Sequence, residues 1–147
     1  MRLTAFTDFG LRALMRIAAE PERSFTTDEI AGELAISRHH LAKIVGDLAG
    51  AGIVKTQRGG GGGFRLARAA ETISLGDIVR LLEGGQPLVE CFRPDGGACM
   101  LSPRCRLKGH LAAANEAFLA ELDKTPLADC RTPPPKRGGR RMRGSVR

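Results

Sequence analysis

The sequence lacks both kinds of apolar segment that would direct a chain into or across a membrane. It contains no apolar run near the roughly 20 residues that a membrane-spanning helix requires. The first residues include Arg2, Asp8 and Arg12 and have no apolar stretch of the kind found in signal peptides. We therefore expect a cytoplasmic protein, a compartment in which cysteines stay reduced.

Acidic residues are missing from one end of the chain. Residues 131–147 contain seven of the 23 lysines and arginines and no acidic residue, which leaves residues 1–130 with 16 basic and 16 acidic side chains. Within this neutral part, one segment carries six basic residues against Asp47 alone: Arg38, Lys43, Lys55, Arg58, Arg65 and Arg68. Such a local patch indicates a polyanionic partner, although an ordinary solvated surface would give the same count.

The sequence also lacks the motifs of common enzymes. No nucleophile and general base occur together in a recognisable catalytic motif. The glycine run at 59–63 is not accompanied by the lysine and the serine or threonine of a phosphate-binding loop. We therefore predict that the protein is not an enzyme.

What the sequence does contain is a series of short amphipathic helices. Residues 8–19 place apolar side chains at helical spacing, with Thr7 as the expected N-cap. Thr26 and Glu29 fit a capping box at the start of a second helix. Ser37 precedes a third helix, whose apolar positions all fall on one face: Leu41, Ile44, Val45 and Leu48.

A hairpin and two further helices follow. Residues 53–58 and 64–66 read as two strands joined by the glycine run. Ser74 begins a fourth helix, and Ser102-Pro103 begins a fifth, which we expect over 103–123 with a long apolar stripe. The sequence therefore predicts a mainly α-helical fold, a winged helix-turn-helix with a cysteine loop and a long C-terminal helix.

In such a fold the second helix of the pair enters the major groove of DNA with its N-terminal residues. Arginine and lysine can bond guanine there, serine can contact phosphate, and a glycine-rich wing tip permits close approach to the backbone. His39 and His40 could equally be ordinary surface residues. The predicted DNA-contacting residues are Ser37, Arg38, His39, His40, Lys43, Lys55, Arg58, Gly59, Gly60 and Arg65.

Three of the four cysteines lie close together in the sequence. Cys91, Cys99 and Cys105 have the spacing C-x7-C-x5-C, and Gly96 and Gly97 permit a tight turn between the first two. Cys105 is expected in the first helical turn, where the helix dipole favours a thiolate. From spacing alone, three reduced or redox-active thiols, a structural zinc site and an iron–sulfur cluster all remain possible.

Four stretches resemble one known family. They are LTAFTDFGLRALMRIA at 3–18, SRHHLAKIVGDLAGAGIVKTQRGGGGGFRLA at 37–67, CRLKGHL at 105–111 and FLAELDKTPLAD at 118–129. The family is the winged-helix iron–sulfur regulators that include NsrR and IscR, and TDFGLRAL together with CRLK is more similar to the nitric-oxide-sensing NsrR. The resemblance covers nearly all of residues 1–130.

This resemblance implies a homodimeric DNA-binding repressor with one iron–sulfur cluster per subunit, most simply 4Fe–4S, with 2Fe–2S as the alternative. Cys91, Cys99 and Cys105 would be ligands, and nitric oxide would release DNA through nitrosylation or loss of the cluster. The resemblance points to Asp8, from the partner subunit, as fourth ligand. Cys130, His110 and an exogenous ligand are the other candidates. The alternative functions are a redox or cluster-supply sensor of the IscR kind and a non-regulatory electron-transfer protein.

We accordingly divide the chain into four parts. Residues 1–82 form the DNA-binding domain, and 83–106 the cluster-binding loop. Residues 103–130 form the dimerisation helix. Residues 131–147, rich in proline, glycine and arginine, form a disordered basic tail that adds salt-sensitive attraction to phosphate.

Overall fold

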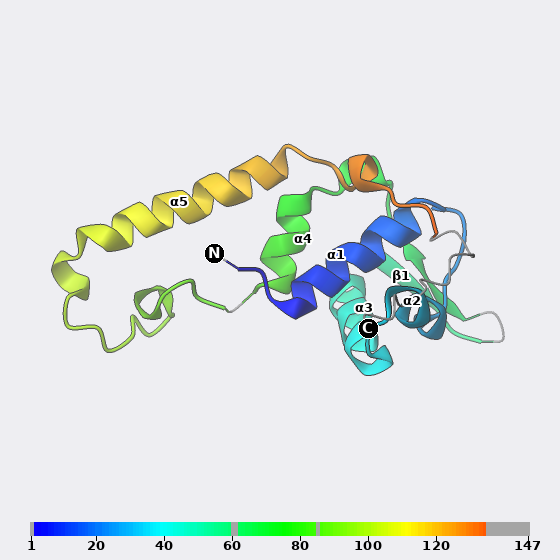
Figure 1. Ribbon diagram of the computed structural model, residues 1–147, viewed down its shortest axis with the longest axis horizontal. Helices are drawn as coiled ribbons and strands as arrows, with labels where there is room; N and C mark the ends of the chain where they lie inside the picture. The colour runs from blue at the N-terminus through cyan, green and yellow to red at the C-terminus, as the bar shows by residue number, and fades with distance from the viewer. Residues whose placement is uncertain (1, 60–61, 85, 135–147) are drawn as a thin grey trace, which may run out of the picture.

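The computed structural model describes residues 2–59, 62–84 and 86–134 (Figure 1). Its elements, in chain order, are α1 (Ala5–Ala18), α2 (Thr27–Leu34), α3 (Arg38–Gly50), β1 (Val54–Gln57), β2 (Gly63–Leu66), η1 (Ala70–Thr72), α4 (Leu75–Leu82), η2 (Glu90–Phe92), η3 (Ser102–Arg104), α5 (Arg106–Asp123) and η4 (Leu127–Cys130). The predicted mainly helical winged helix-turn-helix is confirmed. The predicted disordered tail lies almost wholly outside the described residues.

Three of the predicted N-caps form as expected. The hydroxyl of Thr26 accepts from the Glu29 N–H at 3.1 Å, and the hydroxyl of Ser74 accepts from the Asp77 N–H at 3.0 Å. Ser37 caps α3 in the same way. Each cap satisfies an N–H group that the first helical turn would otherwise leave without a partner. The sequence therefore predicts correctly where α2, α3 and α4 begin.

Two predicted helix starts are wrong. The first helix begins at Ala5 because Thr4, not Thr7, is its N-cap: the Thr4 hydroxyl accepts from the Thr7 N–H at 3.2 Å. The last helix begins at Arg106, and Ser102-Pro103 starts a separate 3-10 turn. Cys105 has an extended backbone, with ψ at 108°, so it stands at the N-cap position rather than within the first helical turn.

The wing is joined to the helical core by backbone pairing. β1 and β2 are antiparallel, with Val54 opposite Leu66. Phe25, just before α2, forms a bridge with Phe64 of β2 through hydrogen bonds of 2.9 and 2.7 Å. Both phenylalanines are fully buried and belong to the same core as the inner face of α3. The position of the wing therefore depends on the segment that leads into α2.

A buried cation connects α1 to this segment. Arg16 is only 3% exposed, and its Nε lies 2.6 Å from Oε2 of Glu33 in α2. Its Nη1 lies 3.0 Å from Glu20, and its Cζ lies 4.8 Å from the centre of the Phe25 ring. Burial alone lowers the pKa of Arg16, but the bonds to Glu33 and Glu20 outweigh it and raise the pKa. A charge buried to this extent requires such partners.

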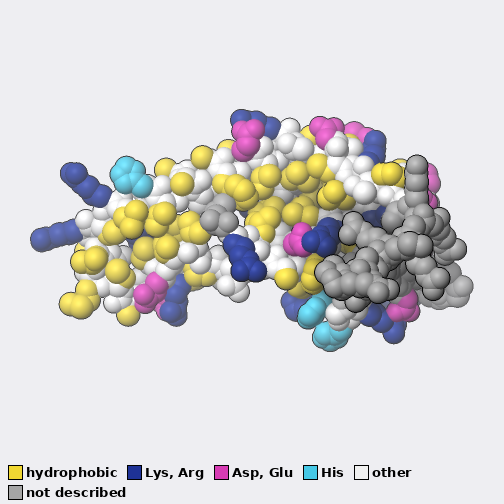
Figure 2. All heavy atoms as spheres, viewed as in Figure 1, with side chains coloured by type: hydrophobic (Ala, Val, Ile, Leu, Met, Phe, Trp, Pro, Cys, Tyr) yellow, Lys and Arg dark blue, Asp and Glu magenta, His cyan; other side chains and the backbone are white. Residues whose placement is uncertain are grey.

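α5 differs from the other α-helices because none of its 18 residues is buried. It packs on α4, where Arg80 donates two hydrogen bonds to the Asp123 carboxylate at 2.6 and 2.7 Å. In Figure 1 it runs away from the winged helix as a long arm. Figure 2 shows hydrophobic side chains gathered over this arm and the segment beside it. A large apolar area of this kind marks an interaction surface.

A carboxylate at the end of α4 holds the start of α1. Oε1 of Glu83 accepts from the Thr4 N–H at 2.7 Å and from the Thr4 hydroxyl at 2.9 Å. Partial burial raises the pKa of Glu83, but hydrogen bonds from Thr7 and Thr4 outweigh it, so the pKa falls below its ordinary value of 4.5. The folded state therefore prefers the charged carboxylate.

Replacement of this carboxylate by an amide should lower stability in a pH-dependent way. A lowered pKa contributes stability above the unfolded-state pKa and loses it as pH falls through the folded-state pKa. We expect Glu83→Gln to reduce the free energy of unfolding at neutral pH by about 1–2 kcal/mol. The difference should shrink in acid. Urea denaturation from pH about 7 to about 3 measures this.

Glu22→Gln is the matched control, since Glu22 is exposed and has no hydrogen bond or ion pair among the described residues. Its effect should be small at every pH. A Glu83→Gln protein as stable as the wild type throughout the titration would show that the charge contributes nothing to the contact between α1 and α4.

Candidate nucleic-acid interface and cysteine site

α3 has one buried and one exposed face. Leu41, Ile44, Val45 and Leu48 are buried, as the apolar stripe predicts. The predicted DNA-contacting side chains of this helix are all exposed: Ser37, Arg38, His39, His40 and Lys43. The N-terminal turns of α3 thus present a mixed cationic and hydrogen-bonding surface to solvent.

Both cations of this face have partners within the chain. Nε of Arg38 lies 2.8 Å from Oδ1 of Asp28, which belongs to the first turn of α2. Nζ of Lys43 lies 3.6 Å from Asp47 and 4.8 Å from the centre of the Phe6 ring in α1. Sequence reasoning missed the roles of Asp28 and Phe6. No local pattern places Asp28 beside Arg38, because the turn between α2 and α3 decides this contact.

The wing adds a second group of basic residues. Lys55 and Arg58 are exposed, and Lys55 is opposite Arg65 in the β1–β2 register. Gly59 has φ of +111°, a conformation that few other residues adopt. Arg65 is half-buried, and its Nε is buried without a hydrogen-bond partner among the described residues. Gly60 lies outside the residues that the structure describes.

The three clustered cysteines lie on the cysteine segment, residues 89–109, which leads into α5. All three are free and half-buried. The Ala98 N–H donates to Glu90 Oε1 at 2.9 Å, which brings the neighbours of Cys99 and Cys91 together. Gly97 makes this closure possible, because a Cβ there would lie 2.7 Å from the Glu90 side chain. The loop between the two cysteines is therefore closed on itself.

Two successive turns connect this loop to the third cysteine. The Ser102 N–H donates to the Cys99 carbonyl at 3.1 Å, and the Cys105 N–H donates to the Ser102 carbonyl at 3.4 Å. Cys105 then stands at the start of α5, where the helix dipole contributes partial positive charge. The three thiols are thus placed by one continuous chain of short-range hydrogen bonds.

These thiols suit an iron–sulfur cluster in their chemistry, since iron in such clusters prefers thiolate. Within the described ranges, however, no three His, Cys, Asp or Glu side chains are close enough to hold one metal ion. Asp8 is not beside them. It forms an ion pair with Arg12 at 2.6 Å in the first turns of α1. Its assignment as a ligand from another subunit stays a prediction.

The two other proposed ligands are also separate from the three cysteines. Cys130 lies in η4, which packs against α1 and η1. The 18 residues of α5, about 27 Å of helix, separate it from Cys105 (Figure 1). His110 lies on α5 and is exposed.

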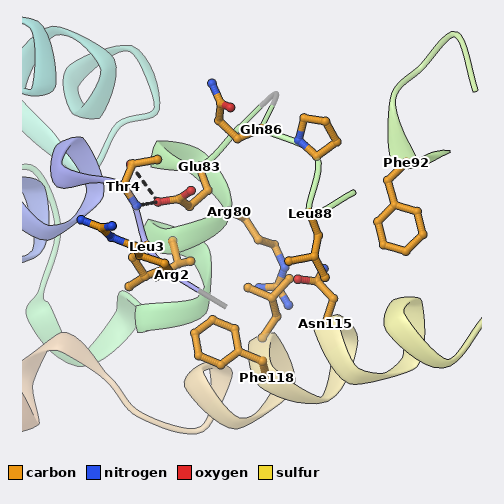
Figure 3. A pocket seen from close by; sticks show the side chains of 13 residues that line it. Arg2, Leu3, Thr4, Arg80, Glu83, Gln86, Leu88, Phe92, Asn115 and Phe118 are labelled. Atoms are coloured by element: carbon orange, nitrogen blue, oxygen red, sulfur yellow. Dashed lines mark hydrogen bonds between the residues drawn. The ribbon is translucent and has the colours of Figure 1, made fainter. Parts of the chain in front are cut away.

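A cavity of about 530 Å³ lies between the start of the chain, α4 and α5. Figure 3 shows Leu88, Phe92 and Phe118 around it, with the Thr4–Glu83 hydrogen bonds on one side. Phe92 directly follows Cys91, so the cavity adjoins the cysteine segment. The apolar stripe of α5 could have indicated this surface, but not the part that residues 2–4 play in it.

The helix pair, the paired wing and the exposed basic face define a winged-helix transcriptional regulator. More particularly, the chain belongs to the Rrf2 family, because the family model described as "Iron-dependent Transcriptional regulator" matches residues 3–132. Members of this family are DNA-binding regulators rather than enzymes, and they typically act as dimers. In the portion of the chain covered by the structure, no helix is long and apolar enough to cross a membrane.

Several solved structures of transcriptional regulators are similar to this chain. Oxidised CymR of Staphylococcus aureus is 30% identical, with a TM-score of 0.67, and the match covers 87% of this chain and 94% of that one. IscR of T. potens is 26% identical, with a TM-score of 0.69 and coverage of 88% and 85%. A putative transcriptional regulator from Listeria innocua is 32% identical, with a TM-score of 0.70 and the same coverage. The narrower resemblance to NsrR stays a prediction.

The placement of the cysteines predicts which of them a cluster needs. We expect Cys91→Ser, Cys99→Ser and Cys105→Ser each to abolish or strongly reduce cluster incorporation, because each removes one of three thiolates. Cys130→Ser should incorporate a cluster like the wild type, since η4 lies at the far end of α5. Anaerobic reconstitution followed by iron and sulfide analysis measures this. A Cys130→Ser protein that loses its cluster would contradict the assignment.

Proposed function

We propose that this protein is a homodimeric, cytoplasmic repressor that holds an iron–sulfur cluster and releases its operator in response to nitric oxide. The observation that carries the proposal is the segment with three free, half-buried thiols attached to a winged-helix domain. Membership of a family described as iron-dependent regulators supports the same reading.

The proposed DNA contacts follow from the exposed face of α3 and the wing. The first turns of α3 would enter the major groove, where Arg38 and the neighbouring polar side chains can reach base edges. Lys55 and Arg58 of the wing would contact the sugar-phosphate backbone. The basic side chains would supply salt-dependent affinity, and the base contacts would supply sequence preference.

The proposed dimer forms through α5. Its apolar stripe is only partly covered in a single subunit, with Leu107 61% exposed and Leu111, Phe118 and Leu122 half-buried. A second copy would cover this stripe and continue the apolar surface around the cavity. Because α5 also begins at Cys105, the same helix would join the subunit interface to the cysteine segment.

The proposed cluster site consists of Cys91, Cys99 and Cys105, completed by Asp8 of the partner subunit. A carboxylate is a harder and weaker ligand for iron than a thiolate, so this position would be the exchangeable one. When bound, the cluster would supply iron that a small diatomic molecule can attack. Asp8 would have to exchange its ion pair with Arg12 for this role.

α1 provides a route between the two proposed sites. Its first turns carry Asp8 and also Phe6, which lies against Lys43 of α3. Its later turns carry Arg16, which holds α2 and the Phe25 bridge to the wing. A shift of α1 would therefore move the recognition helix and the wing together. In a dimer it would also change the spacing between the two recognition helices, which must match about one turn of DNA, roughly 34 Å.

A second candidate is a redox or cluster-supply sensor with a 2Fe–2S centre. The similarity to IscR and to oxidised CymR supports it, because both matches cover more than four-fifths of this chain. An anaerobic absorption spectrum with iron and sulfide analysis distinguishes the two cluster types.

The role of Asp8 gives the proposal its sharpest test in the protein itself. We expect Asp8→Ala to keep a cluster but to change its absorption spectrum and its rate of reaction with nitric oxide, because the fourth ligand would differ. Asp77→Ala is the matched control: Asp77 also lies in the first turn of a helix and is exposed, but it neighbours Arg80. Stopped-flow absorption under anaerobic conditions measures both variants.

The control should react like the wild type. If Asp8→Ala and Asp77→Ala both give wild-type spectra and wild-type nitric oxide kinetics, Asp8 is not a ligand.

A further inference from the structure

The ion pair between Arg38 and Asp28 lies at an exposed corner of the helix-turn-helix. Arg38 is the first residue of α3 and Asp28 the second of α2. Their side chains are 73% and 68% exposed, and the contact joins Arg38 Nε to Asp28 Oδ1 at 2.8 Å. An exposed pair of this kind contributes little to folding stability. If the pair has a role, that role is therefore to constrain the orientation of the Arg38 side chain.

The atoms of the contact matter because a guanidinium is planar and rigid. Asp28 contacts Nε, the nitrogen nearest the side-chain stem, so the two N–H groups that point away from the stem at the end of the guanidinium have no partner among the described residues. Two terminal N–H groups side by side match the O6 and N7 acceptors of guanine in the major groove. In a complex with DNA, the pair would leave these two N–H groups available to a base edge and would reduce the rotamer freedom that Arg38 loses on binding.

Among the described residues that line the adjoining cleft, Arg38 and Asp28 are the charged ones. A cleft of about 270 Å³ lies between the starts of α2 and α3 and the wing. Its other described lining residues are uncharged: Thr26, Thr27, Val45, Thr56, Gln57, Gly62, Gly63 and Phe64. Asp28 is therefore the carboxylate that a phosphate entering this cleft would meet, and it would repel that phosphate.

We propose that Asp28 is a specificity-determining residue, which directs Arg38 to a guanine base and opposes its binding to backbone phosphate. The proposal rests on the DNA-binding face assigned to α3 above. Specificity is a difference between two affinities, and Asp28 acts on both of them. It stabilises the base-reading orientation of Arg38 and weakens binding to DNA of unrelated sequence.

Lys43 and Asp47 provide a matched control on the same helix. Asp47 lies 3.6 Å from Lys43, and both side chains are exposed, so Asp47→Asn removes the same charge from the same surface. A lysine is a point charge without a fixed bonding plane, so loss of its partner should not alter base discrimination. Asp47→Asn should strengthen binding to all duplexes to a similar extent.

The experiment begins with the wild-type protein, reconstituted anaerobically and used to select binding sites from a random duplex library. The selected consensus, each of its single-base-pair variants and an unrelated duplex are then titrated with the wild type, Asp28→Asn, Asp47→Asn, Arg38→Ala and the Asp28→Asn/Arg38→Ala double variant. Fluorescence anisotropy gives the dissociation constants. A library that yields no consensus would overturn the proposed function itself, and the role of Asp28 with it.

With a consensus in hand, Asp28→Asn should bind the unrelated duplex several-fold more tightly than the wild type. It should lose up to about 5-fold in discrimination at one guanine, since an exposed ion pair of this kind contributes at most about that factor and the arginine itself remains. Arg38→Ala should lose discrimination at the same base pair, and the double variant should lose little more, because the two residues act as a unit.

Two results would overturn the assignment while leaving the proposed function intact. One is unchanged discrimination at every base pair in Asp28→Asn. The other is an equal rise in affinity for all duplexes in Asp28→Asn and Asp47→Asn. That result would show that Asp28 acts only by non-specific repulsion of DNA.

Discussion

The arrangement of this molecule depends most on one buried cation. Arg16 lies inside the protein at 3% exposure, with Glu33 and Glu20 as partners and the ring of Phe25 against its guanidinium. Through Glu33 it fixes α2 on α1, and through Phe25 it reaches the backbone pairing that holds the wing. Without it, Glu33 would lose its counter-charge, and breaking a pair of this kind costs about 3–5 kcal/mol in fully buried cases. The recognition helix and the wing keep their relation to α1 because this contact exists.

α1 is consequently shared by every part of the proposed switch. Its start is held by Glu83 at the end of α4, just before the chain enters the cysteine segment. Phe6 touches the recognition helix through Lys43, and Asp8 is the carboxylate that we propose as a ligand in the partner subunit. α5 contributes the second connection, because it begins at Cys105 and leaves an apolar stripe for another copy of the chain. A change at the cysteine segment thus has two physical routes to the DNA-binding face.

Local patterns in the sequence were sufficient for most of the fold. Helix caps such as Thr26 and Ser74 act within three residues, and the apolar stripe of α3 repeats within two turns. Both can therefore be recognised from the sequence alone. The wrong predictions were two helix starts at which the sequence offers more than one possible residue. Thr4 rather than Thr7 caps α1, and α5 begins at Arg106 rather than at Pro103. Contacts between distant residues were beyond reach: Thr4 and Glu83 are 79 positions apart, and Asp28 and Arg38, ten positions apart, are separated by a turn whose geometry decides the contact. Cys91, Cys99 and Cys105 could be proposed as ligands from residue type, but the hydrogen bond from Ala98 to Glu90 that closes the loop between the first two is not visible in their spacing.

The central claim is that the state of the cysteine segment controls the DNA-binding face. It is tested most directly by measuring operator affinity for three states of one anaerobic preparation: with its cluster, after nitric oxide, and after removal of iron. The account predicts tight, sequence-specific binding in the first state, and weak binding close to that of unrelated DNA in the other two. Equal operator affinity in all three states would contradict it, whatever the spectrum of the cluster.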